Sequence, residues 1–106
     1  MIHPFLEAYR PALTALCEQY NVAQLYVFGS VTTAAFDVDR SDVDFLVEFK
    51  EEPRLSPEEQ GERLWNLYFS PEELLSRKVD LLRVRPFRNP YFARSVEATK
   101  QVLYAA

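Results

Sequence analysis

The sequence predicts an α+β fold: a small, three- to four-stranded mixed β-sheet with helices packed on it. Apolar residues recur at three- and four-residue spacing in some segments and at two-residue spacing in others, and the two kinds of segment alternate along the chain. No repeat, low-complexity tract or linker interrupts the 106 residues. We therefore expect one domain, residues 1–106, in which all helices pack against a single sheet.

Five helical segments are expected, one of them a short helix directly after Gly29-Ser30. Apolar spacing predicts the first from Phe5 to Tyr20, with a kink or a helix start near Arg10 because Pro11 falls inside it. Residues 56–59 and 70–73 have the same sequence, Ser-Pro-Glu-Glu, and each predicts a new helix with a serine N-cap, proline in the first turn and glutamate at the third position. Asn89-Pro90 predicts the start of a last helix, which we expect to include Leu103.

Three strands are expected between these helices. Leu25-Tyr26-Val27-Phe28 is a short apolar run of β-forming residues, typical of a buried strand. Residues 43–49 alternate, so that Val43, Phe45, Val47 and Phe49 are expected on one face and Asp42, Asp44, Leu46 and Glu48 on the other. Residues 79–84 are expected to form the third strand.

Composition and charge exclude several classes of function. The chain has a single cysteine, Cys17, no apolar run of membrane-spanning length and no basic leader, so we expect a cytoplasmic protein that does not bind a membrane. A net charge of −4 argues against direct nucleic-acid binding. Residues 37–62 carry ten acids against three bases, and residues 77–100 carry seven bases against two acids. These segments could together bind a metal-bound polyanion, or they could be solvated surface charge.

The candidate site begins with Gly29-Ser30, directly after the first strand. Glycine at this position lets backbone N–H groups approach a phosphate, and Ser30 could cap a following short helix or bind a phosphate oxygen. The dipeptide alone is also common in ordinary turns.

Three aspartates strengthen the prediction of a phosphate-binding site. Asp42 and Asp44 are two residues apart on a strand, so both carboxylates project to one side. Clustered carboxylates require a cation or hydrogen-bond donors, and hard oxygen ligands favour Mg²⁺. Asp80 lies between apolar residues of the third strand, where an unpartnered carboxylate is costly. If the two strands are neighbours, the three carboxylates could hold two Mg²⁺ ions for phosphoryl transfer.

This pattern resembles the DNA polymerase β-like nucleotidyltransferase superfamily, and within it the minimal nucleotidyltransferases (MNT), the antitoxin partners of HEPN toxins. The resemblance runs nearly end to end and rests on residues 25–30, 41–47, 78–81 and 88–91. It implies the polymerase β-like fold and a Mg²⁺-dependent transfer of a nucleoside monophosphate, AMP from ATP, to a protein hydroxyl. Gly29 and Ser30 would hold the nucleotide phosphates, Asp42 and Asp44 would bind both metals, and Asp80 would bind the catalytic metal and help to deprotonate the acceptor.

The resemblance also implies partners. The chain is too short to carry a separate acceptor-binding domain, so we expect a protein acceptor, a HEPN-domain toxin, held in a homo- or hetero-oligomer. The family usually has a basic residue and a glycine soon after Gly-Ser, whereas residues 31–35 (Val-Thr-Thr-Ala-Ala) supply neither. Two alternatives therefore stand beside the enzyme: a catalytically degenerate module that neutralises a partner by masking its surface, and a structural domain with incidental acids.

Overall fold

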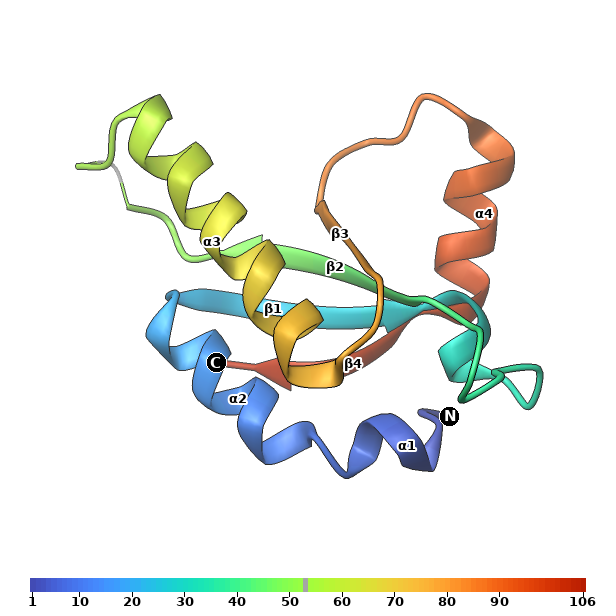
Figure 1. Cartoon of the computed structure of the whole chain (residues 1–106). Helices are drawn as coiled ribbons and strands as arrows, with labels where there is room; N and C mark the ends of the chain where they lie inside the picture. Colours follow the sequence, from blue (N-terminus) through green and yellow to red (C-terminus); the bar gives the residue numbers. More distant parts are fainter. Residues whose placement is uncertain (53) are drawn as a thin grey trace.

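A four-stranded mixed sheet forms the centre of the computed structural model, which describes residues 1–52 and 54–106 (Figure 1). Its strands are β1 (Val22–Phe28), β2 (Val43–Phe49), β3 (Val79–Arg83) and β4 (Gln101–Ala105), in the order β3-β2-β1-β4. β1 pairs antiparallel with β2 and with β4, whereas β2 and β3 run parallel. The sheet is therefore mixed, and the α+β class expected from the sequence is confirmed.

Helices cover both faces of this sheet. The main core joins α1 (Pro4–Glu7), α2 (Arg10–Gln19) and α3 (Pro57–Leu75) to one face, through buried side chains such as Leu13, Leu67 and Phe45. A smaller cluster on the other face joins α4 (Pro90–Thr99) to the sheet through Phe28, Leu46 and Val96. Leu46 is thus buried on the face that also carries Asp44, so this face is only partly open to solvent.

Several helix starts and one strand expected from the sequence are confirmed. α2 begins at Arg10, and Pro11 occupies its first turn. Ser56 caps α3 in a complete capping box, in which its hydroxyl accepts from the Glu59 N–H and the Glu59 carboxylate accepts from the Ser56 N–H. Asn89 caps α4 by accepting from the N–H groups of Tyr91 and Phe92. β2 occupies the expected residues, Val43–Phe49.

Two expectations about the later elements are wrong. The Ser-Pro-Glu-Glu sequence at 70–73 does not start a helix, because α3 continues through it with Pro71 inside. The Ser70 hydroxyl donates to the Asn66 carbonyl at 3.0 Å in place of capping a new helix. The last helix ends at Thr99, and Leu103 lies buried in the fourth strand, β4, which the sequence did not distinguish from the helix before it.

Among the helices of the described part of the chain, none is long and apolar enough to cross a membrane.

Candidate active site

Two of the three candidate aspartates meet across the parallel strands. The register of β2 and β3 pairs Asp44 with Asp80, so their side chains emerge side by side on one face of the sheet. Asp44 is half-buried, whereas Asp80 is exposed because β3 is the edge strand. The expectation that Asp80 is embedded among apolar groups is therefore wrong, and its carboxylate is open to a ligand approaching from solvent.

The environment of Asp44 favours its protonated form. Burial, followed by repulsion from and hydrogen bonding to Asp80, raises the Asp44 pKa to about 6, and Asp42 adds a smaller repulsion. Lys78 acts in the opposite direction and lowers this pKa. Without a cation, the Asp44–Asp80 pair thus resists carrying two charges. Such a pair fits a divalent cation, whose charge would remove the repulsion.

Gly29 lies directly beside this pair. It follows β1, in which Phe28 is the register partner of Asp44, and its φ of 76° is one that side-chain-bearing residues rarely adopt. A Cβ atom at Gly29 would lie 2.7 Å from Asp44 Oδ2, closer than nonbonded atoms can approach. Glycine therefore makes the space in which the Asp44 carboxylate sits, in addition to giving a ligand access to the backbone.

The short helix expected after the first strand is a single 3-10 turn. Gly29 and Ser30 open η1 (Gly29–Thr32), a 3-10 turn of four residues. Ser30 does not cap it, because Phe28 occupies the cap position. The Gly29 N–H, which would face a phosphate, donates to Thr99 Oγ1 at 3.0 Å. A phosphate at this turn would have to compete with Thr99 for that hydrogen bond.

Asp42 lies in the loop just before β2 and points toward a base. Its side chain is 43% exposed, and Asp42 Oδ2 is 3.9 Å from Lys78 Nζ. The loop is held by Arg77, whose guanidinium donates to the carbonyls of Ser41 and Val38. The sequence analysis gave no site role to Arg77, Lys78 or Thr99, although Lys78 belongs to the segment 78–81 that carries the family resemblance.

The chemistry of the donor set suits Mg²⁺, but three ligands are not assembled. Within residues 1–52 and 54–106, no three histidine, cysteine or acidic side chains converge in a way that would hold a metal ion. Asp44 and Asp80 supply the hard oxygen atoms that Mg²⁺ prefers, and Asp42 would have to turn from Lys78 to join them. Asp44 and Asp80 thus fit the metal, and the role of Asp42 as a ligand stays a prediction.

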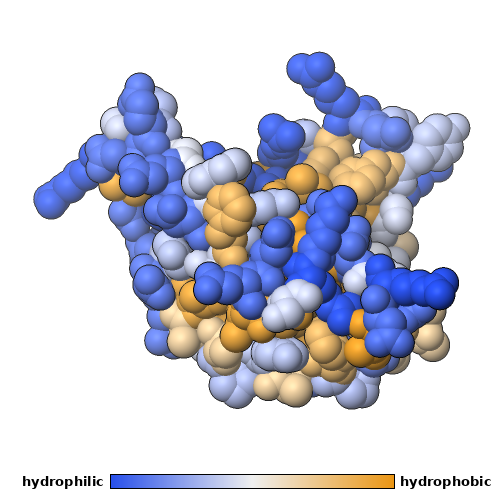
Figure 2. Space-filling view, in the orientation of Figure 1, coloured by the Kyte–Doolittle hydropathy of each residue, from blue (hydrophilic) through white to orange (hydrophobic). Residues whose placement is uncertain are grey.

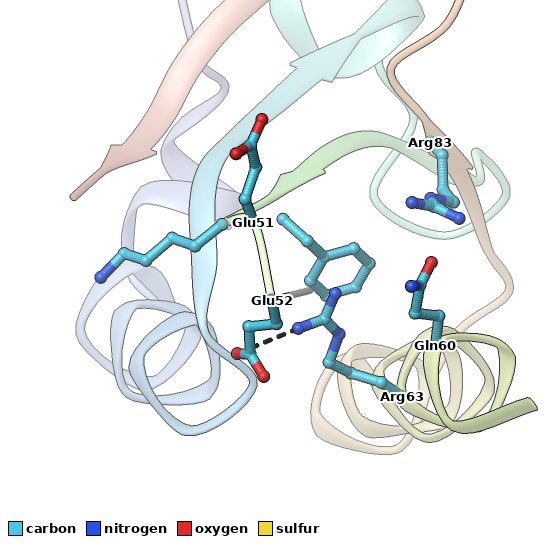
Figure 3. Close-up of a pocket in the computed structure, with 7 residues that line it drawn as sticks. Glu51, Glu52, Gln60, Arg63 and Arg83 are labelled. Atoms are coloured by element: carbon cyan, nitrogen blue, oxygen red, sulfur yellow. Dashed lines mark ion pairs between the residues drawn. The ribbon is translucent and has the colours of Figure 1, made fainter. Parts of the chain in front are cut away.

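A separate pocket lies at the far end of β2 from these carboxylates (Figure 3). The Arg63 guanidinium lies 4.1 Å from the centre of the Phe49 ring and pairs with Glu52 at 3.2 Å. Gln60, which like Arg63 comes from α3, and Arg83 of β3 also line the pocket (Figure 3). These contacts fasten α3 to the end of β2, which accounts for Arg63 in structural terms.

Comparison with known proteins agrees with this fold. The model of the nucleotidyltransferase domain family matches residues 10–103. The chain belongs to this family. All five candidate site residues of this nucleotidyltransferase domain lie inside the matched range: Gly29, Ser30, Asp42, Asp44 and Asp80.

Relatives and solved structures support the assignment. The chain is 34% identical over 82 residues to "Putative protein adenylyltransferase MJ0128" of Methanocaldococcus jannaschii, covering 77% of this chain and 76% of that protein. A solved structure named "putative minimal nucleotidyltransferase" has a TM-score of 0.61 and 28% identity, with 95% of each chain covered. A chain in the complex of a tri-AMPylated Shewanella oneidensis HEPN toxin with its MNT antitoxin has a TM-score of 0.62 and 18% identity, covering 94% of this chain and 72% of that one. This last similarity concerns the fold.

Proposed function

We propose that this nucleotidyltransferase domain transfers AMP from ATP to a hydroxyl group of a protein, in a Mg²⁺-dependent reaction. The observation that carries the proposal is the register pairing of Asp44 with Asp80 beside the Gly29 turn. The acceptor oxygen would attack the α-phosphorus of ATP, a new P–O bond would form, and pyrophosphate would leave. Bound Mg²⁺ would supply positive charge to the phosphates and to the attacking oxygen.

Each site residue has a separate task in this reaction. Asp80, the exposed carboxylate, would accept the proton of the attacking hydroxyl and contribute an oxygen ligand. Asp44 would hold metal from its half-buried position, with Asp42 completing the ligand set after leaving Lys78. The backbone at Gly29 and the hydroxyl of Ser30 would position the triphosphate.

A protein is the acceptor class that the exposure of Asp80 favours. Asp80 lies on the edge strand of the sheet, so a macromolecule can approach it without entering a cleft. The names of the relatives point the same way: one is a protein adenylyltransferase by name, and one structural neighbour comes from a complex with an AMPylated HEPN toxin. We therefore propose that the chain acts as an antitoxin on a HEPN-type toxin.

The first experiment is a thermal melt with Mg²⁺, ATP or both, on wild type and on Asp42→Asn. A ligand at 100 times its dissociation constant adds about 2.7 kcal/mol of stability, which raises the melting temperature by several degrees in a domain of this size. We expect a joint Mg²⁺–ATP shift in wild type that the variant loses. Equal melting in all conditions would count against a nucleotide site in the isolated chain.

Transfer itself is tested by mass spectrometry of a HEPN toxin incubated with the chain, ATP and Mg²⁺. We expect adducts of one AMP per modified residue, abolished by Asp80→Asn, which changes charge at nearly constant shape. Asp39→Asn is the matched control, because Asp39 is an exposed acid of the loop before β2. A toxin that is modified equally by both variants would remove Asp80 from the site.

One observation favours the second candidate, a binding module without catalysis. The Gly29 N–H is already bonded to Thr99, and no basic residue follows Ser30 in the turn. In that case a variant with Asp44→Asn and Asp80→Asn would still neutralise a co-expressed toxin, and the toxin would carry no AMP. Under the transferase proposal, the same variant loses neutralisation.

A further inference from the structure

One stripe of α3 faces outward and combines acidic with aromatic side chains. Its members follow four- and three-residue spacing and form what we call the acidic aromatic stripe: Glu58, Glu62, Trp65, Phe69 and Glu72. Trp65 is 63% exposed and Phe69 is 45% exposed, and their rings meet edge to face at 4.8 Å. The one basic residue of α3, Arg63, turns inward to Glu52 and Phe49, so it does not neutralise this stripe.

A second exposed surface has the opposite charge. It lies on the loop after β3 and on the start of α4, and we call it the basic aromatic surface: Val84, Arg85, Arg88, Tyr91, Phe92 and Arg94. Residues 84–94 contain three arginines and no acid. Tyr91 is the most exposed large hydrophobic side chain of the described residues, at 78%.

Among the residues that the structure describes, the charged groups of both surfaces form no ion pair. In the described residues, the ion pairs join Arg10 to Glu7, Arg63 to Glu52, Lys78 to Asp42 and Lys100 to Glu97, and none involves either surface. Five of the eight exposed large hydrophobic side chains of the described residues lie on these two surfaces. Exposed apolar groups rimmed by polar residues are typical of protein interfaces.

We propose that the chain forms a two-fold symmetric dimer in which the acidic aromatic stripe of each copy covers the basic aromatic surface of the other. α3 and the β3–α4 loop stand on either side of β3 and extend to the same side of the molecule (Figure 1). The space-filling view shows them as two projections with a hollow between (Figure 2). A two-fold axis that passes through that hollow relates the two copies, so that α3 of each copy meets the β3–α4 loop of the other. Both contacts then form at once and the assembly closes.

A second copy fits better than another partner because each surface already has its complement on the same molecule. The acidic stripe centres on Trp65 and Phe69, and the basic surface centres on Tyr91 and Phe92, so apolar centres meet apolar centres and charged rims meet opposite charges. This dimer is independent of the transferase activity proposed above and would form without ATP or Mg²⁺.

Charge reversal on each surface tests the proposal. Sedimentation is measured for wild type, for Glu62→Lys with Glu72→Lys, and for Arg88→Glu with Arg94→Glu. We expect wild type to dimerise and each double variant alone to remain monomeric, because like charges then meet at both contacts. An equimolar mixture of the two variants should dimerise again, because every contact of the mixed pair joins opposite charges. Restoration in the mixture is specific, since damage to folding could not be corrected by mixing.

The single tryptophan gives an independent readout of the same contact. Trp65 emission should shift to shorter wavelength as wild type is concentrated, and should shift back as salt is raised from about 0.05 to about 0.5 M, which screens the charged rims. Trp65→Ala should weaken dimerisation at least about tenfold. Val102→Ala is the matched control, because Val102 is 49% exposed on β4 and belongs to neither surface.

Three results would overturn the proposal. They are a wild type that stays monomeric up to about 1 mM, a variant mixture that stays monomeric, and a wild type that grows beyond the dimer. The last would show contacts that do not close.

Discussion

Asp44 is the residue at which folding and the proposed chemistry conflict most directly. Its pKa of about 6 reflects burial and the neighbouring Asp80, which a bound cation would offset. In the metal-free protein the pair costs stability at neutral pH. A site residue that destabilises its own fold is consistent with a binding role and has no evident structural one.

Replacing this carboxylate should therefore stabilise the metal-free protein at neutral pH. The Asp44 pKa is higher in the folded chain than its ordinary value of 3.8. Protonation of Asp44 therefore stabilises the fold fully at a pH below 3.8, and this stabilisation is lost as the pH rises through about 6. We expect Asp44→Asn to melt above wild type at a pH of about 8 and to lose this advantage at a pH of about 4. Thermal melts in a chelator, with Asp39→Asn as the control, measure the difference. A pH-independent difference would contradict the assigned pKa.

The two glycines of the chain provide a matched pair of substitutions. Gly29→Ala introduces a side chain at a φ of 76° and against Asp44 Oδ2, so we expect a loss of about 1–2 kcal/mol or more in unfolding free energy. Gly61 lies exposed in α3 with nothing within 4 Å of an added Cβ atom, so Gly61→Ala should gain about 0.5–1 kcal/mol. Urea unfolding of both variants measures the two changes. Equal effects would show that Gly29 has no special role.

At the scale of single elements, α3 ends in a conformation that favours glycine. Ser76 terminates the helix with a φ of 51° and a ψ of 42°, in the left-handed region. Ser76→Gly removes the steric cost of a Cβ atom there, so we expect a gain of about 1 kcal/mol in unfolding free energy. Denaturant unfolding measures it, and Ser95→Gly in the exposed part of α4 should instead lose a similar amount. A loss at Ser76 would contradict this account of the helix end.

Capping sequences correctly predicted the start of a helix where the preceding residues are not helical. The capping box at Ser56 and the cap at Asn89 each follow a loop, so no earlier helix competes with them. Ser70-Pro71 carries the same letters but arrives while α3 is already helical, and the packing of Leu67, Pro71 and Leu75 in α3 outweighs the hydrogen bond that proline removes. Leu103 continues the helical spacing of α4, so only pairing with β1 reveals it as a strand residue.

The part of the candidate site that lies on strands was predictable from the sequence, whereas the part that depends on distant contacts was not. The alternation of residues 43–49 placed Asp44 on the face opposite Val43, Phe45 and Val47, and the short apolar run around Asp80 identified a strand that could lie next to it. Asp42 lies outside β2, in the loop before it, where its carboxylate approaches Lys78. The contact between Thr99 and Gly29 joins residues 70 positions apart through α4 and carries no local signal. The exposure of Asp80 likewise depends on the strand order, which the sequence leaves open.

At the scale of the whole molecule, the sheet depends on its last strand. β4 pairs with β1, buries Leu103 in the main core and supplies the Leu103 carbonyl to the Arg10 guanidinium. It thereby covers the edge of β1 that faces away from β2.

Removing residues 101–106 should therefore prevent cooperative folding. The deletion exposes the main-chain groups of β1 and takes Leu103 from the core, for which truncation of a buried leucine alone costs about 2–5 kcal/mol. Circular dichroism and amide chemical-shift dispersion measure the outcome, and Leu103→Ala in the full chain shows how much depends on the side chain. A truncated chain that unfolds cooperatively like wild type would contradict the importance of β4.

The strand order also has a consequence for synthesis on the ribosome. β1 is complete at Phe28, but its second neighbour begins at Gln101, 73 residues later. At about 5–20 residues per second, roughly 4–15 s separate the two events. During that interval the nascent chain presents an apolar strand with a free edge, which is the state most prone to pair with another chain. Chaperone binding to this protein should accordingly be confined to the period before residue 105 leaves the exit tunnel.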